Sequence, residues 1–252
     1  MRTASFAAAH SIIDSWPKER SRRRFSLMST QIASYYEMVS QLPDNASVTF
    51  HDVSWDEYEE LLEQVGEAPG LRISYDNGSL QVITISSEHE KYASFISGLV
   101  TVIRLRLRID ILGFGSATMR KRKRKKGNEP DGCFYVQTAS LIGNKIQLDF
   151  ETDPPPDIAV EVDVHHDSRS KFPIYAALGV PEIWRYDGTA MTFYHLAKDA
   201  NQIEASLFVE QDTSAALPML SAQILTEMIE RMRTDGELNA LLAFDEWLQS
   251  RK

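Results

Sequence analysis

The segment that most constrains the fold is residues 157–164, where acidic or small side chains alternate with branched apolar ones (Asp-Ile-Ala-Val-Glu-Val-Asp-Val). Successive side chains of a β-strand point to opposite faces of a sheet. A strand over this segment therefore has one apolar face and one face that carries Asp157, Glu161 and Asp163. The apolar face predicts a strand that lies on a hydrophobic core. The acidic face is either the solvent-facing side of an ordinary sheet or a binding surface.

The spacing of these acidic residues favours a cation site. Glu161 and Asp163 lie roughly 6.6 Å apart along a strand, at about 3.3 Å per residue. Carboxylates this close repel each other unless a cation lies between them, and Mg²⁺ takes oxygen ligands and needs only one or two carboxylates. Asp157 lies about 13 Å from Glu161 on the same face, too far for one ion to bridge. It follows three prolines, residues 154–156, and we expect it to satisfy a loop.

Two further residues are placed to join this site. Asp131 follows Pro130 and precedes a short apolar segment, residues 133–136. If that segment pairs with the strand over 157–164, Asp131 and Glu161 converge on one cation. An aspartate after a proline is also common in turns. Lys171 begins a predicted helix after the acidic strand, and a surface lysine or a local ion pair is the alternative there.

The patterns before this region predict a helix and a hairpin. Ser54 and Glu57 have the spacing of a capping box, which predicts a helix from residue 55. Asn77-Gly78 separates two apolar segments, and this dipeptide is the strongest short signal for a β-hairpin. Together they predict that the folded part of the chain begins near residue 48.

Ser87 and Glu90 have the same capping-box spacing, and the apolar residues that follow repeat at helical intervals as far as Leu107. Beyond this helix the patterns predict short strands, one more helix and a helical C-terminus. The predicted strands cover residues 113–119, 133–136, 157–164, 182–186, 191–196 and 203–209, and the predicted helix covers residues 171–178. This order predicts a mixed α/β or α+β single domain.

Charge divides the 252 residues into segments. The chain has a net charge of −9, although residues 1–40 carry six basic and three acidic side chains. We expect residues 1–47 to be a poorly ordered basic extension, residues 48–219 to form the main domain, and residues 220–252 to form helices packed on it or extending from it. A later start at Met28 or Met38, or a basic targeting peptide, is the alternative for the extension.

Composition excludes several classes of protein. The single cysteine, Cys133, excludes an internal disulfide and a multi-cysteine zinc site, and a mid-strand cysteine is usually a small buried apolar residue. No apolar run reaches the roughly 18 residues that a membrane helix needs. We therefore expect a cytoplasmic protein that does not bind membranes.

A run of seven basic residues is the clearest electrostatic feature of this acidic chain. The run comprises Arg120, Lys121, Arg122, Lys123, Arg124, Lys125 and Lys126. Such a run suits phosphate contacts along a polyanion, and a solvated, mobile loop is the alternative. No aromatic residues interrupt it, so the run does not predict base stacking.

Four blocks of sequence resemble a known family. The blocks are Glu88-His-Glu90, Glu129-Pro-Asp131, residues 155–163 and the long block of residues 171–187 (Lys-Phe-Pro-Ile-Tyr-Ala-Ala-Leu-Gly-Val-Pro-Glu-Ile-Trp-Arg-Tyr-Asp). They resemble the Uma-two-type restriction endonucleases (domain of unknown function 820), a group within the PD-(D/E)XK nuclease superfamily. The resemblance covers roughly residues 53–229, most of the globular part.

The resemblance implies a restriction-endonuclease-like core, a central mixed sheet flanked by helices. It also implies an endonuclease that hydrolyses DNA phosphodiester bonds with Mg²⁺ or Mn²⁺. Asp131 and Glu161 match the family's metal-binding acids, and a backbone carbonyl near Val162 would complete the protein ligands. The superfamily often dimerises, and cutting two strands needs two sites, so a homodimer is expected.

The chain departs from the superfamily pattern at Asp163, where the pattern has a lysine. Lys171 matches the position from which this family supplies that lysine, and it would position or polarise the attacking water. Asp163 would bind a second ion or pair with a base, and Glu88 or His89 would add a ligand or position the water. A non-catalytic nucleic-acid-binding or regulatory module with the same fold is the alternative, and a hydrolase of small phosphate esters is a third reading.

Overall fold

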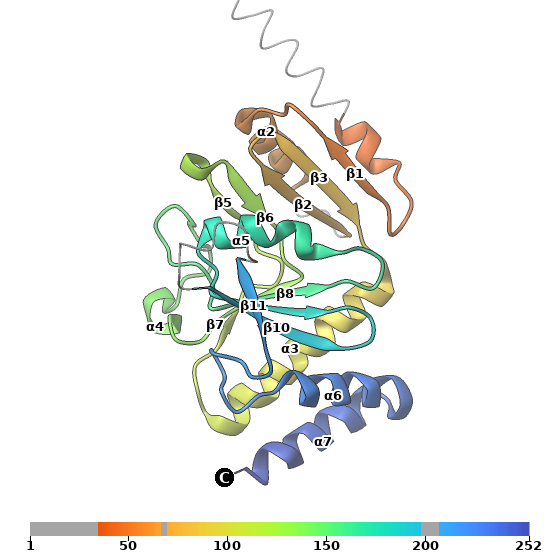
Figure 1. Cartoon of the computed structure of the whole chain (residues 1–252), viewed down its shortest axis with the longest axis vertical. Helices are drawn as coiled ribbons and strands as arrows, with labels where there is room; N and C mark the ends of the chain where they lie inside the picture. Colours follow the sequence, from red (N-terminus) through yellow and green to blue (C-terminus); the bar gives the residue numbers. More distant parts are fainter. Residues whose placement is uncertain (1–34, 67–69, 198–206, 252) are drawn as a thin grey trace, which may run out of the picture.

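The computed structural model describes residues 35–66, 70–197 and 207–251 (Figure 1). Two β-sheets form its centre. The first has the strand order β1-β3-β2-β6-β5 and the second the order β11-β10-β9-β8-β7-β4. β8 and β9 are parallel, whereas the other neighbours are antiparallel. The second sheet is therefore mixed and helices flank it, which confirms the predicted α+β fold class.

The first sheet is built on the predicted hairpin. β2 (Leu71–Asp76) and β3 (Ser79–Thr84) pair in the register expected for a two-residue turn. Asn77 and Gly78 both have positive φ, 47° and 98°, as a type I′ turn requires. The sheet is completed by β1 (Ser47–Phe50), β5 (Met119–Lys121) and β6 (Lys126–Asn128).

Helix α2 (Trp55–Val65) covers this sheet, and the predicted capping box begins it. The Ser54 hydroxyl accepts from the Glu57 amide at 3.2 Å, and the Glu57 carboxylate accepts from the Ser54 amide at 2.7 Å. These reciprocal bonds satisfy two amides that a helix start would otherwise leave without partners.

The second sheet lies between helices on both of its faces. Its strands are β4 (Leu112–Gly113), β7 (Gly132–Tyr135), β8 (Ile158–Val162), β9 (Glu182–Tyr186), β10 (Met191–Leu196) and β11 (Phe208–Gln211). On β8, Ile158, Val160 and Val162 contact the core formed with α3, while Ala159 contacts the core formed with α5. Both faces of this strand are therefore buried, and the solvent-facing alternative for its acidic face is wrong.

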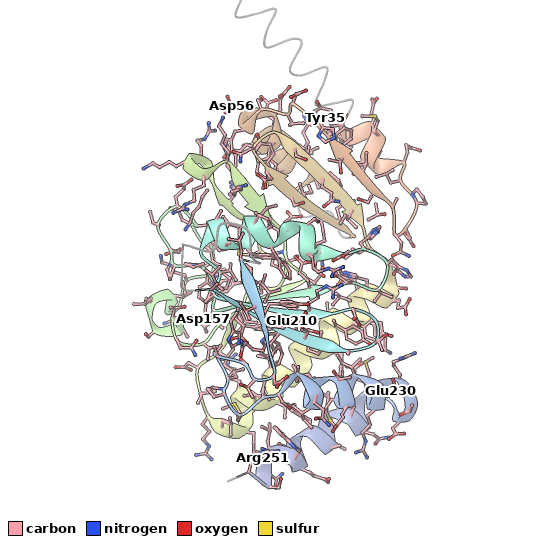
Figure 2. All side chains as sticks on the ribbon, viewed as in Figure 1. Tyr35, Asp56, Asp157, Glu210, Glu230 and Arg251 are labelled. Carbon is pink, nitrogen blue, oxygen red and sulfur yellow. The ribbon has the colours of Figure 1, made fainter. Side chains whose placement is uncertain are left out.

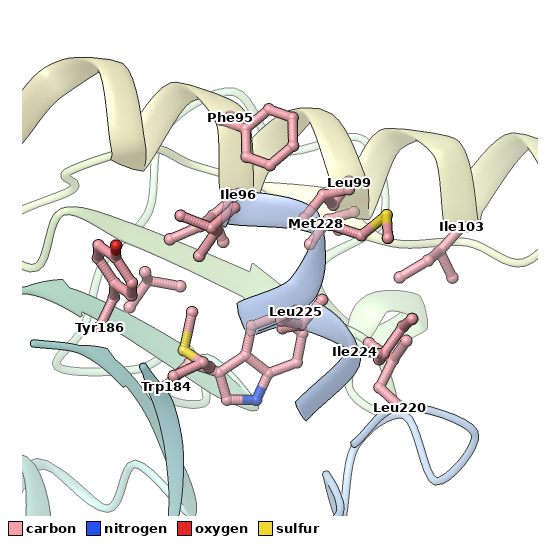
Figure 3. Packing of buried hydrophobic residues seen from close by; sticks show 14 of the residues in the cluster. Phe95, Ile96, Leu99, Ile103, Trp184, Tyr186, Leu220, Ile224, Leu225 and Met228 are labelled. Carbon is pink, nitrogen blue, oxygen red and sulfur yellow. The ribbon is translucent and has the colours of Figure 1, made fainter. Parts of the chain in front are cut away.

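Helix α3 (Ser87–Leu107) forms the main core with the second sheet and the C-terminal helices. Figure 3 shows Phe95, Ile96 and Leu99 above Trp184 of β9 and Leu225 of α6. The helix begins one residue earlier than predicted, because the Ser86 hydroxyl accepts from the His89 amide and Ser86 is thus the N-cap.

The C-terminal helices α6 (Ala222–Asp235) and α7 (Glu237–Gln249) pack on α3 and β10 (Figure 1). Helix α5 (Phe172–Leu178) follows a short 3₁₀ turn, Ser168–Lys171, and lies on the opposite face of the second sheet. A short helix α4 (Ala139–Ile142) follows β7.

One predicted strand differs from the structure, and two further predictions lie largely outside the described residues. Residues 113–119 are not one strand, because the chain crosses there from β4 in the second sheet to β5 in the first. Most of the predicted strand over 203–209 lies outside the described residues, and β11 begins at Phe208. The extension was predicted for residues 1–47, and residues 1–34 of it lie outside the described residues.

The packed part of the chain begins before the predicted boundary at residue 48. Residues 35–40 are helical, and Tyr35 and Val39 are buried against the first sheet. Apolar side chains of this short helix cover the end of a small core, which the charge pattern of the segment did not indicate. Within the described ranges, no helix is both long and apolar enough to cross a membrane.

Candidate active site

The pairing of β7 with β8 brings the predicted acids together. Gly132 lies opposite Val160, and the Asp131 amide donates to the Val160 carbonyl at 2.9 Å. Asp131 therefore precedes its strand directly beside the end of β8, where Glu161 lies. Both carboxylates line one small cavity with Lys171 and Asp163. The condition stated for their convergence, pairing of the two strands, is met.

Asp131 is held by groups from three other elements. Its Oδ1 accepts from Arg72 Nε at 2.9 Å, and its Oδ2 accepts from the Val162 amide at 2.8 Å. His89 Nε2 lies 3.1 Å from the same Oδ2. Arg72 comes from β2 and His89 from the first turn of α3, so the first sheet and α3 both reach this carboxylate.

Glu161 is the most enclosed acid of the cluster, with 2% of its surface exposed. Its Oε2 lies 3.0 Å from Lys171 Nζ, and its Oε1 accepts from the Tyr175 hydroxyl and, at 3.5 Å, from Asn128 Nδ2. Lys171 and Tyr175 are one helical turn apart, so the 3₁₀ turn and α5 present both to Glu161. The structure thus places Lys171 beside Glu161, and its predicted role in positioning water stays a prediction.

Asp163 pairs with a base, which is one of the two roles expected for it. Its Oδ2 accepts from Arg185 Nε and from the Ser168 amide and hydroxyl at 2.8 and 2.9 Å. Glu161 and Asp163 thus each have a basic partner from the chain itself. The repulsion that suggested a bound cation is already offset by Lys171 and Arg185.

The structure does not bring Glu88 into the cluster. The Glu88 side chain is 54% exposed and lies 3.6 Å from His165 Nε2, whereas its neighbour His89 is buried against Asp131. Of the two alternatives for this helix start, the geometry therefore selects His89. Asp157 accepts from the amides of Val136 and Thr138 and from the Thr138 hydroxyl, so it satisfies a loop as predicted.

Burial and charge set the protonation of the cluster. Burial alone would raise the pKa of Asp131, but the hydrogen bond from His89 and the charges of Lys171 and Arg72 lower this pKa. Burial raises the pKa of Glu161, and the neighbouring charges of Asp131 and Asp163 add to that effect. Although burial opposes it, the carboxylates of Glu161 and Asp131 raise the pKa of Lys171. The lysine therefore stays protonated at neutral pH.

The donor set fits a small, hard cation. A carboxylate offers about four lone pairs, and the contacts above leave one unused on Asp131 Oδ1 and one on Glu161 Oε2. The cavity between them has a volume of about 20 Å³, more than the roughly 10–15 Å³ that one water needs. Among the described residues, no three His, Cys, Asp or Glu side chains are grouped to hold a metal. A metal here would keep several waters, as Mg²⁺ commonly does.

Several residues of this cluster were not predicted. Arg72, Asn128, Tyr175 and Arg185 all contact the acids. Arg72 left at most a weak signal in the sequence, as a charged residue between Leu71 and Ile73 of a hairpin strand. The four residues lie on four different elements, so their meeting depends on how the two sheets and α5 pack.

The predicted basic run forms an ordered hairpin tip, the basic tip, defined as residues 120–126. It comprises the end of β5, a short 3₁₀ turn and the start of β6, so the mobile-loop alternative is wrong. Arg122 pairs with Asp56 and Glu59 of α2, and Lys126 pairs with Asp76. Within the part of the chain that the structure describes, five basic side chains of the tip have no acidic partner: Arg120, Lys121, Lys123, Arg124 and Lys125.

The basic tip extends away from the acidic cluster along β2 and β6. Its near end is close to the cluster, because Lys126 is two residues, about 6.6 Å along a strand, from Asn128, which contacts Glu161. A polyanion bound along the tip could therefore reach the cluster.

This chain is similar to a known protein family and to a solved structure. The family model Uma2, described as a putative restriction endonuclease, matches residues 55–226, more than half of the chain. The chain belongs to the Uma2 family. The matched range contains each residue of the acidic cluster. Restriction-endonuclease-like families generally use divalent metal ions, so the donor set suits the family.

One solved structure is similar to this chain. The crystal structure of a putative nuclease belonging to DUF820 from Anabaena variabilis ATCC 29413 is 15% identical to this Uma2 chain. The alignment covers 69% of this chain and 98% of that chain, with a TM-score of 0.44. No curated protein matches this chain in sequence.

Proposed function

We propose that this Uma2 chain is a metal-dependent endonuclease that hydrolyses phosphodiester bonds of DNA. The observation that carries the proposal is the convergence of Asp131, Glu161 and Lys171 from three segments at one buried cavity. Two acids can hold a cation that activates water, and a lysine beside them can stabilise charge on the phosphate, so the set suits phosphodiester hydrolysis. Membership of a family of putative restriction endonucleases supports the same reaction.

The chain's own residues have distinct roles in this proposal. Asp131, Glu161 and the backbone carbonyl of Val162 would hold Mg²⁺ or Mn²⁺. Such an ion, when bound, lowers the pKa of a water and stabilises charge on the phosphate. Lys171 orients the attacking water and offsets negative charge in the transition state. His89 restrains Asp131.

Other groups would keep this arrangement in place. Tyr175 restrains Glu161 through its hydroxyl, so that the carboxylate keeps one free lone pair toward the cavity. Asp163 is engaged by Arg185 and Ser168 and serves to place the turn that carries Lys171. The basic tip would contact phosphates away from the cleaved bond.

One observation favours a second candidate, a non-catalytic nucleic-acid-binding module. The acids are almost fully enclosed and already paired with Arg72, Lys171 and Arg185. A charge-balanced, buried cluster also suits a purely structural role, because its basic partners neutralise the buried acids without a bound ligand. Metal binding separates the two candidates, because only the nuclease needs a cation at these acids.

The test is cleavage of supercoiled plasmid and of a duplex oligonucleotide with Mg²⁺ or Mn²⁺, comparing wild type with Glu161→Ala and Glu161→Gln. The nuclease predicts cleavage that requires the metal and is lost in both variants. Glu227→Gln on α6, whose side chain bonds Gln223 and does not line the cavity, is the matched control and keeps the activity. Cleavage that persists in the Glu161 variants contradicts the assignment of the site. Duplex binding without any cleavage supports the binding module.

A further inference from the structure

A groove opens beside the acidic cluster and shares one residue with it. The groove has a volume of about 490 Å³, and Arg72, Glu90, Thr118 and Glu129 supply polar groups to its wall. Arg72 also lines the small cavity of the cluster. Its guanidinium is therefore the group through which the open groove adjoins the buried acids.

Two nitrogens of the Arg72 guanidinium donate to groups that stay in place, and the partner of the third nitrogen can be replaced. Nε donates to buried Asp131, and Nη1 donates to the Leu71 carbonyl at 2.9 Å. Nη2 contacts Glu90 Oε1 at 3.0 Å, and the Glu90 side chain is 51% exposed. The Arg72 side chain is only 9% exposed, but the Glu90 end of the pair is open to solvent, and an ion pair with this access to water is worth about 1 kcal/mol. A stronger anion can therefore replace Glu90 without disturbing the bond to Asp131.

The other acid of this groove cannot move in the same way. Glu129 accepts from the Ile73 amide at 2.9 Å and from the Thr118 hydroxyl at 2.7 Å, so both of its oxygens are held. Among the described residues, the Glu90 carboxylate has only Arg72 as a partner. Glu90 is thus the mobile anion at the mouth of the site.

We propose that the Arg72 edge facing the groove is a phosphate-binding subsite for a nucleic-acid phosphodiester, and that Glu90 occupies it until the substrate enters. A guanidinium fork binds phosphate oxygens with charge-assisted, directional hydrogen bonds. A single guanidinium group separates a phosphate on this edge from Asp131. The phosphate therefore lies beside the acids that the proposed function uses. The inference rests on that proposed function for the identity of the substrate.

The test measures binding of a fluorescent 20-base-pair DNA duplex by anisotropy in EDTA, so that no metal or cleavage contributes. Glu90→Gln removes the competing carboxylate and is expected to tighten binding about fivefold. Glu230→Gln is the matched control, because Glu230 is also an exposed helical glutamate paired with an arginine, Arg233. Glu230 lies on α6 (Figure 2) and does not line the groove, so this variant loses the same charge outside the groove, and it should leave binding within about twofold.

A second variant guards against an indirect effect of Glu90→Gln. Arg72→Lys keeps a positive charge beside Asp131 but has no fork, so the double variant Arg72→Lys/Glu90→Gln should lose the gain. Equal tightening by Glu90→Gln and Glu230→Gln would show a general charge effect and overturn the inference. If Glu90→Gln tightens the binding of inorganic phosphate, measured by competition, but not that of the duplex, the groove binds a small phosphate. This result also overturns the inference.

The outcomes distinguish the inference from the proposed function. Selective tightening by Glu90→Gln without cleavage by any variant keeps the subsite and rejects the nuclease. Cleavage that depends on Glu161, with no selective effect of Glu90→Gln, keeps the nuclease and rejects the subsite.

Discussion

Replacing Lys171 with methionine should strongly destabilise the protein. Lys171 is 5% exposed, and its Nζ lies 3.0 Å from Glu161 Oε2. At an effective dielectric constant of about 20, two unit charges at that separation attract by roughly 5.5 kcal/mol. Desolvation of the two groups offsets part of this, and removing one partner of a buried pair typically costs about 3–5 kcal/mol. We expect Lys171→Met to lie in that range.

The assay is denaturant-induced unfolding in EDTA, with the wild-type slope retained as the sign that the variant folds in the same way. A loss of this size lowers the melting temperature by roughly 6–20 °C for a domain of this length. Lys91→Met, at an exposed position on α3, is the control and should change stability by less than about 0.5 kcal/mol.

A companion variant tests the charge balance itself. Glu161→Gln together with Lys171→Met removes both charges. The free energy of unfolding that the double variant loses should therefore be smaller than the sum of the two single losses by about 0.5–3 kcal/mol. If Mg²⁺ or Mn²⁺ binds at these acids, it should also restore part of the stability of Lys171→Met, because the ion replaces the missing positive charge. A loss below 1 kcal/mol for Lys171→Met would refute the reasoning, since Lys171 would then not be what neutralises Glu161.

Three further predictions concern pH, thiol chemistry and packing. Burial raises the pKa of the Glu161 carboxyl above 4.5, so the folded state binds this proton more tightly than the unfolded state does. The stability of wild type relative to Glu161→Gln should therefore fall as pH rises above 4.5. Denaturant unfolding of both proteins at pH 4.5–8 measures this, and the opposite trend would contradict it. Burial raises the pKa of Cys133 to about 12, so iodoacetamide at pH 8 should label the thiol only in denaturant, as mass spectrometry would show. A methyl group on Gly127 would overlap the Tyr58 ring; Gly127→Ala should cost about 1–3 kcal/mol in thermal unfolding, and adding Tyr58→Leu should recover part of the loss.

Local patterns predicted much of the fold because their signals are short-range. The capping box at Ser54 and the turn at Asn77-Gly78 involve neighbouring residues, and both are present in the structure. The segment 113–119 failed for the opposite reason. Its strand-like composition does not show that the chain leaves one sheet and enters the other within it.

The site was predicted in part. Asp131 could be joined to Glu161 from the sequence because a single strand pairing suffices, and Lys171 follows Glu161 by ten residues. Glu88 and His89 were alternatives in the sequence, and only the rotation of α3, which turns His89 inward and leaves Glu88 exposed, decides between them. Arg72 is 59 residues from Asp131, and no periodic pattern links positions that far apart.

The sequence by itself determined that a strand lies within residues 157–164, observed as Ile158–Val162, and that apolar and acidic side chains alternate across it, because the side-chain period of a strand is two. Only the tertiary structure decided what that acidic face contacts. Helix α5 and β2 cover it, which desolvates Glu161 and Asp131 and supplies Lys171, Tyr175 and Arg72 as partners. Periodicity sets the direction of a side chain, whereas burial and neutralisation depend on elements that pack against it from elsewhere in the chain.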